Sequence, residues 1–224
     1  MFLNQVPLQH LWLCPFLAGL AWFFTLFALL VTWLAKGMPK YPMQSNPCVA
    51  FISDMAAFTL KPLFLVGGSI TAVSFILTVC AVHFARYSHR MYGIDDVRWK
   101  KSLSIFAMIS GVVASLALVL LAGMDTLRFH EEHAVLLLVC FVGLAFSAIA
   151  TTIVYFDQTW NPSPFRRLRV YCILSAMTIS IDFCLGVAFY SLMRSEHWKI
   201  AGILEWIMAF TGTFYIWAFI GFVS

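Results

Sequence analysis

Three ionisable side chains of this sequence could do chemistry together: Asp54, His130 and Glu205. A carboxylate that holds a histidine in one tautomer raises the basicity of the ring, so His130 could act as a general base oriented by Asp54 or Glu205. Such a group would act on an ester or a phosphate. No Ser or Cys in a recognisable nucleophile setting accompanies the three residues, so the sequence assigns no catalytic residue firmly.

A second chemistry is suggested by the string His-Glu-Glu-His at 130–133. On a helix His130 and His133 are three residues apart, so both could face one site and bind a metal ion. The string is not the HExxH motif, and no third ligand stands nearby. The alternative is a polar helix start, where Glu131 and Glu132 complement the positive end of the helix dipole. We therefore expect neither a metal nor another cofactor.

Asp182 and Glu205 lie inside otherwise apolar runs. A carboxylate at membrane depth costs several kcal/mol unless it is paired, protonated or hydrated, so each is a candidate functional residue. The alternative is an interhelical hydrogen bond that fixes packing. We favour that alternative for Asp182. For Glu205 we favour a shared site with His130 and Asp54, because all three fall on one side of the predicted membrane.

Six long apolar runs must position these residues. They cover 11–35, 62–85, 102–124, 134–156, 170–193 and 201–223. Each has at least about 20 residues, which at about 1.5 Å per residue crosses a hydrocarbon layer about 30 Å thick. Backbone groups in lipid must be paired within their own segment, so the runs predict helices. The expected fold is an all-α polytopic membrane protein, a six-helix bundle forming one domain over residues 1–224.

Composition agrees with this fold. The chain is 62% hydrophobic and 11% charged, with a mean hydropathy of +0.90. Six spans leave almost no sequence for an independent soluble domain. The charges are too few, and too close to the membrane, for nucleic acid to be a partner.

The distribution of Lys and Arg predicts the orientation. The connections after the second and fourth runs, on the side shared with both termini, hold eight of these residues, and the opposite side holds six. The side richer in Lys and Arg faces the cytoplasm. We therefore expect both termini to be cytoplasmic.

The cytoplasmic connections could attract anionic lipid headgroups, at about 1 kcal/mol per charge. Arg86 and Arg90 belong to this basic face. The residues that we expect to meet phosphoinositides or a peripheral lipid-kinase complex are Arg98, Lys100, Lys101, Arg166, Arg167 and Arg169. The alternative is that these residues only determine topology.

The connection at 37–61 is the longest on the outer side, and its 48–58 part is apolar. An apolar connection does not lie freely in water, so we expect it to pack over the helix ends and to carry Asp54 into a partly enclosed position. As an alternative role, Ser53 or Asp54 would cap a short helix beginning at Met55.

Short motifs of the chain resemble those of a known membrane family, in order and spacing. They are Phe51-Ile52-Ser53-Asp54, His130 followed by an acid, and Glu205-Trp206, continued by Asn46-Pro47, Ala209-Phe210 and Phe214-Tyr215. The family includes the damage-regulated autophagy modulators (DRAM), the fibroblast-growth-factor-receptor activating protein and the yeast suppressor-of-four-kinase protein. The resemblance implies six spans and singles out Asp54, His130 and Glu205, with Trp206 beside them, as a binding set. His133 lies outside the pattern.

The resemblance also implies a function. One branch of the family is associated with the plasma membrane, with recruitment of a phosphatidylinositol 4-kinase complex and with phospholipid asymmetry. We therefore expect a non-enzymatic membrane regulator of lipid organisation at the plasma membrane. The alternatives are a lysosomal autophagy modulator, or an enzyme of glycosylphosphatidylinositol (GPI) anchor lipid remodelling in the Golgi or endoplasmic reticulum that uses the outer His and carboxylates. The chain ends at Ser224 directly after the last run, so we expect any kinase complex to dock on the inner connections.

Overall fold

The computed structural model describes residues 10–42, 44, 46–88, 93–157 and 166–223, with the side chains of 166 and 167 excepted. Over these ranges the regular structure is entirely helical. The helices are α1 (Leu13–Ala35), α2 (Ile52–Ala56), α3 (Lys61–Tyr87), α4 (Arg98–Gly123), α5 (His130–Tyr155), α7 (Arg166–Arg194) and α8 (Trp198–Ala218), followed by the 3-10 helix η3 (Phe219–Phe222).

Six of these helices are long and apolar enough to cross a membrane, which confirms the predicted six-helix membrane fold. The helices extend beyond several of the predicted runs because polar residues form their first turns. Thus α4 begins at Arg98 and α5 begins at His130. Pro62 lies in the first turn of α3, where the missing N–H removes no helical hydrogen bond.

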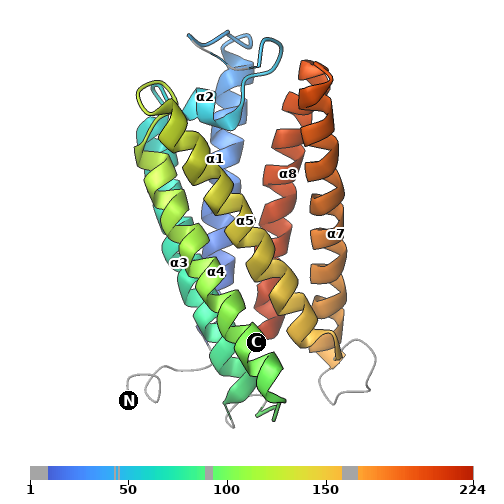
Figure 1. Cartoon of the computed structure of the whole chain (residues 1–224). Helices are drawn as coiled ribbons and strands as arrows, with labels where there is room; N and C mark the ends of the chain where they lie inside the picture. Colours follow the sequence, from blue (N-terminus) through green and yellow to red (C-terminus); the bar gives the residue numbers. More distant parts are fainter. Residues whose placement is uncertain (1–9, 43, 45, 89–92, 158–165, 224) are drawn as a thin grey trace.

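The six long helices run side by side, with α2 at one end of the bundle (Figure 1). We call this end the α2 face; it also carries the starts of α3, α5 and α8. The opposite end, the terminal face, carries the start of α1, the ends of α3 and α5, and η3. The first and last long helices, α1 and α8, are neighbours.

Packing is most extensive between α4 and α5, where small residues allow the backbones to approach. A Cβ atom added at Gly143 of α5 would lie 3.0 Å from the backbone oxygen of Ser110 and 3.0 Å from Ala114 Cβ, both on α4. Lipid tails are as apolar as leucine, so such close packing, rather than burial from water, holds membrane helices together. By contrast, α7 packs mainly on α8 and contacts α5 less extensively.

Two apolar clusters fill the bundle. The cluster toward the terminal face contains Phe75 of α3, Tyr155 of α5 and Phe219 of η3. The cluster toward the α2 face contains Leu26 and Leu29 of α1 together with residues of α2. The second cluster therefore anchors the short helix that carries Asp54.

Candidate functional site

The segment 46–56, which we call the α2 cover, is fixed to the start of α8 by Asn46. This side chain is completely buried. Its Nδ2 donates a hydrogen bond to the Trp198 carbonyl oxygen at 2.7 Å, and its Oδ1 accepts from the backbone N–H groups of Cys48 at 2.9 Å and Val49 at 3.2 Å. An amide serves here because it is both donor and acceptor.

Further along α8 the cover is held by Trp206 and by close backbone approach. The Trp206 indole Nε1–H donates to the Ala50 carbonyl oxygen at 3.1 Å. A Cβ atom added at Gly202 would lie 2.7 Å from Val49 Cβ and 2.7 Å from Asn46 Nδ2. A larger residue than glycine at 202 would therefore push the cover away from α8.

The two carboxylates of the predicted site meet at the start of α2. Asp54 is 4% exposed, which confirms its enclosed position, and its Oδ2 accepts the Phe51 N–H at 3.0 Å. Glu205 Oε2 accepts the next amide, that of Ile52, at 3.3 Å. The first amides of a helix lack helical partners, and acidic acceptors satisfy them. The prediction of a helix beginning at Met55 is wrong: α2 begins at Ile52, because these acceptors stabilise an earlier start.

Apolar contacts attach the other side of the cover to α1. Ile52 and Met55 are buried in the cluster that contains Leu26, Leu29 and Trp33 of α1. Phe51 also contacts Phe189 of α7, with ring centroids 6.2 Å apart. The cover thus joins the first helix of the chain to the last two.

The hydrogen bond that the structure shows for the His130 side chain does not go to either of these carboxylates. His130 is exposed, and its Nδ1 lies 3.5 Å from Thr126 Oγ1. His133 is buried and donates from Nδ1 to the Met124 carbonyl oxygen at 2.7 Å. The prediction that both imidazoles could face one site is wrong, because one points outward and the other inward. No cluster of three or more His, Cys, Asp or Glu side chains suited to a metal occurs among the described residues.

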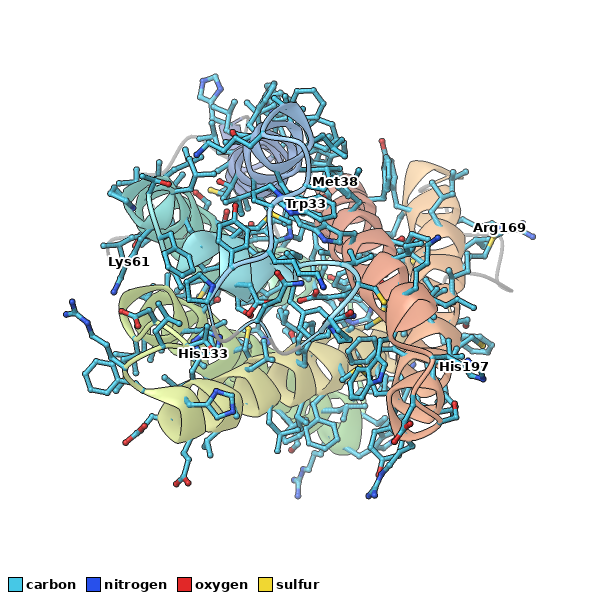
Figure 2. The ribbon with its side chains drawn as sticks, turned by 90° about the horizontal axis from the view of Figure 1, so that it is seen from above. Trp33, Met38, Lys61, His133, Arg169 and His197 are labelled. Atoms are coloured by element: carbon cyan, nitrogen blue, oxygen red, sulfur yellow. The ribbon has the colours of Figure 1, made fainter. Side chains whose placement is uncertain are left out.

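On the same face, Asp125 fixes the start of α3 to the α4–α5 connection. Lys61 Nζ lies 2.6 Å from Asp125 Oδ2, and Asp125 Oδ1 accepts the N–H groups of Arg128 and Leu127. The hydrogen bond from Lys61 is the largest cause that holds the pKa of Asp125 below its ordinary range. Figure 2, which looks onto the α2 face, shows Lys61 and His133 on one side of the bundle, across from His197.

A buried ion network occupies the terminal face. Arg86 is completely buried; its Nε donates to Asp96 Oδ2 at 2.6 Å and its Nη2 donates to Asp96 Oδ1 at 3.0 Å. The guanidinium also lies 4.6 Å from the Tyr155 ring centroid. Burial alone would raise the pKa of Asp96, but the hydrogen bonds and charge of Arg86 outweigh burial and hold this pKa below its ordinary range. Arg86, predicted to lie on a lipid-facing basic surface, is therefore an internal residue.

Asp157 extends this network to α4. Its Oδ2 lies 3.6 Å from Arg86 Nη2 and 3.0 Å from Lys100 Nζ. Two acids thus compensate the charges of Arg86 and Lys100 inside the protein. The network joins the ends of α3 and α5 to the start of α4.

The other basic residues of the terminal face differ in their exposure and pairing. Lys101 is exposed and pairs with the almost fully exposed Asp95 at 3.2 Å. Arg98 and Arg169 are exposed, and neither forms an ion pair with the parts of the chain described here. Arg90 and the side chains of Arg166 and Arg167 lie outside the described residues.

Sequence reasoning missed two structural roles. Asn46 appeared only as part of a motif, although its place beside Pro47 marks a turn whose side chain can bond to nearby amides. Arg86 appeared only as a basic connection residue. The acid at 96 is ten residues away in sequence, and sequence spacing alone does not pair residues across a connection.

Comparisons with known proteins give two matches. The profile described as Frag1/DRAM/Sfk1/Cwh43P N-terminal domain matches residues 10–221. The chain is 24% identical over 177 residues to Protein SFK1 of Saccharomyces cerevisiae, a match that covers 67% of this chain and 50% of the relative. The chain thus spans about half the length of this curated relative. No solved structure matches.

Proposed function

The chain belongs to the Frag1/DRAM/Sfk1/Cwh43P N-terminal domain family, and from that membership we propose that it is a non-enzymatic regulator of membrane lipid organisation. We propose that it acts at the plasma membrane, where it recruits a peripheral phosphatidylinositol 4-kinase complex and supports phospholipid asymmetry. In this proposal the terminal face is cytoplasmic, as the excess of Lys and Arg on that side predicts.

The non-enzymatic role is supported by the hydrogen bonds that Asp54 and Glu205 accept. Both carboxylates accept backbone N–H groups at the start of α2, so they hold the cover in place. His130 is exposed, and its hydrogen bond goes to Thr126. In a triad-like site the base is oriented by a third group within hydrogen-bond reach. These contacts support a structural role for the two acids over a His–carboxylate reaction centre.

The proposed docking surface consists of the exposed basic residues of the terminal face. Arg98 and Arg169 support it best, because no acid among the described residues pairs with them. Trp99, which is 56% exposed beside Arg98, suits the headgroup region, where tryptophan rings collect. Anionic headgroups add about 1 kcal/mol for each nearby Arg or Lys. Lys100 contributes less, because Asp157 neutralises it.

The test is quantitative imaging of phosphatidylinositol 4-kinase at the plasma membrane in cells lacking the protein. Wild type is expected to restore recruitment, whereas the double variant Arg98→Gln/Arg169→Gln is expected to restore less than half of it. The matched control is Arg128→Gln/Lys199→Gln, which removes two exposed charges from the α2 face and is expected to behave as wild type.

Two results would contradict the proposal. If the amount of phosphatidylinositol 4-kinase at the plasma membrane is unchanged when the protein is absent, recruiting the kinase is not a function of the protein. Loss of function in His130→Ala, with normal expression and localisation, would instead favour chemistry at the outer side. In that case the lipid of GPI anchors is the first substrate to measure.

A further inference from the structure

The first turn of α4 carries Arg98 and Trp99 of the docking surface, but its own sequence supports it poorly. The residue before it, Val97, forms no side-chain capping hydrogen bond, and the turn contains no acidic residue. Its positive charges come from Arg98, Lys100 and Lys101. The N-terminal end of a helix already carries a partial positive charge, so cations there are unfavourable. Contacts from other parts of the bundle must therefore keep this turn helical.

Asp96 anchors the chain two residues before this turn. Its carboxylate accepts two hydrogen bonds from the buried Arg86 guanidinium, and its Oδ2 also accepts from the Tyr87 hydroxyl at 3.1 Å. The Ile94 N–H donates to the Arg86 carbonyl oxygen at 2.9 Å. The entry to α4 is thus fixed to the end of α3.

Asp157, just beyond the end of α5, holds the turn itself. Its Oδ2 accepts a hydrogen bond from Lys100 Nζ at 3.0 Å. The Lys100 side chain is 18% exposed and that of Asp157 is 28% exposed, so solvent and salt screen this ion pair less than a fully exposed one. Lys100 Nζ also lies 5.9 Å from the centroid of the Trp99 ring, within the range of a cation–π contact. Fixing Lys100 therefore also restrains the exposed Trp99.

The other two cations of the turn are held less firmly. Lys101 pairs with Asp95 at 3.2 Å, but their side chains are 47% and 96% exposed, and ion pairs in such positions contribute little to stability. Lys101 Nζ also lies 5.9 Å from the centroid of the Tyr87 ring. Arg98 forms no ion pair within the described ranges. The pair between Lys100 and Asp157 is therefore the strongest ionic restraint that the described residues place on this turn.

We propose that Asp157 is a positioning residue of the docking surface, because it holds the first turn of α4 in the helical form that presents Arg98 and Trp99 together. This role opposes simple charge attraction. If charge alone mattered, removing an acid from this face would strengthen the attraction of anionic headgroups. If Asp157 positions the turn, removing its charge weakens docking. The use of the surface rests on the proposed function, whereas the ordering of the turn does not.

The first test compares Asp157→Asn with its matched control Asp95→Asn in the kinase-recruitment assay, at equal expression. Each variant removes one negative charge from the terminal face, so the two change its net charge equally. Asp157→Asn is expected to restore less than half of the wild-type recruitment, and Asp95→Asn at least all of it. Asp157→Glu keeps the charge and is expected to restore most of it. Equal recruitment by Asp157→Asn and Asp95→Asn would overturn the proposal.

A second measurement follows the turn directly and does not involve the kinase. Hydrogen exchange of the purified protein, read by mass spectrometry, reports how often the amides of residues 100–104 open. Their exchange is expected to be several-fold faster in Asp157→Asn than in Asp95→Asn, with the amides of α8 unchanged. Equal exchange in the two variants would overturn the proposal. Recruitment that does not depend on the protein would contradict the proposed function alone, because exchange would still decide whether Asp157 orders α4.

If Asp157→Asn does not fold, Lys100→Met and Arg98→Met decide the question by the same exchange measurement. Each removes one cation from the first turn of α4, so relief of the unfavourable charge is similar in both. Only Lys100→Met also breaks the pair with Asp157. Faster exchange of residues 100–104 in Lys100→Met than in Arg98→Met is expected, and equal exchange would overturn the proposal.

Discussion

Asn46→Ala tests whether the α2 cover depends on one buried amide. The substitution removes three hydrogen bonds: one to the Trp198 carbonyl oxygen and two from the N–H groups of Cys48 and Val49. Each such bond contributes about 0.5–1.5 kcal/mol, so the expected loss in the free energy of unfolding is about 3 kcal/mol. For a chain of this size that loss lowers the melting temperature by about 6–12 °C.

The assay is intrinsic tryptophan fluorescence of the detergent-purified protein during heating. Asn46→Asp is the matched comparison, because it keeps an acceptor for Cys48 and Val49 but loses the donor to Trp198. Its melting temperature is expected to lie between those of wild type and Asn46→Ala. A fall of less than 1 °C in Asn46→Ala would refute the reasoning, because the three bonds would then contribute almost nothing.

Three further predictions concern other parts of the bundle. Arg86→Met leaves the buried Asp96 carboxylate without the Arg86 guanidinium. Breaking a buried ion pair in this way is expected to lower the free energy of unfolding by about 3–5 kcal/mol, measured by thermal unfolding. Asp125 has a lowered pKa in the folded protein, so its contribution is complete above the ordinary value of about 3.9 and is lost as the pH falls through the lower folded value. The melting temperature is therefore expected to fall with acidification below about pH 4, and Asp125→Asn should flatten that slope. Gly143→Ala places a Cβ atom 3.0 Å from a backbone oxygen and is expected to reduce the yield of folded protein, whereas Gly68→Ala, whose Cβ would meet Ala122 at 3.6 Å, should be tolerated.

Much of the fold could be predicted from the sequence because lipid imposes one simple requirement. Each backbone amide of a spanning segment must be paired locally, so the length of an apolar run is enough to indicate a helix. The enclosed position of Asp54 could be predicted for a similar reason, since an apolar connection does not remain in water. These inferences depend only on nearby residues.

The parts that sequence reasoning missed depend on residues that are distant in the chain. The start of α2 at Ile52 requires Glu205, which is 153 residues away. The burial of Arg86 requires Tyr155 at the end of α5 and Asp157 just beyond it. The different exposures of His130 and His133 depend on which side of α5 meets the bundle. Helical spacing predicts that two residues are neighbours, but it does not predict which direction they face.

The dependence of the α2 cover on α8 has a consequence for biosynthesis. Asn46 and Trp206 hold the cover through partners 152 and 156 residues apart in sequence, so the attachment of the cover to α8 can form only after the last helix has left the ribosome. Until then the cover has its apolar contacts with α1, but the Asn46 side chain lacks its acceptor at Trp198. A chain that terminates before residue 198 can never form these hydrogen bonds. The hydrogen bonds between the cover and α8 therefore belong to the last stage of bundle assembly.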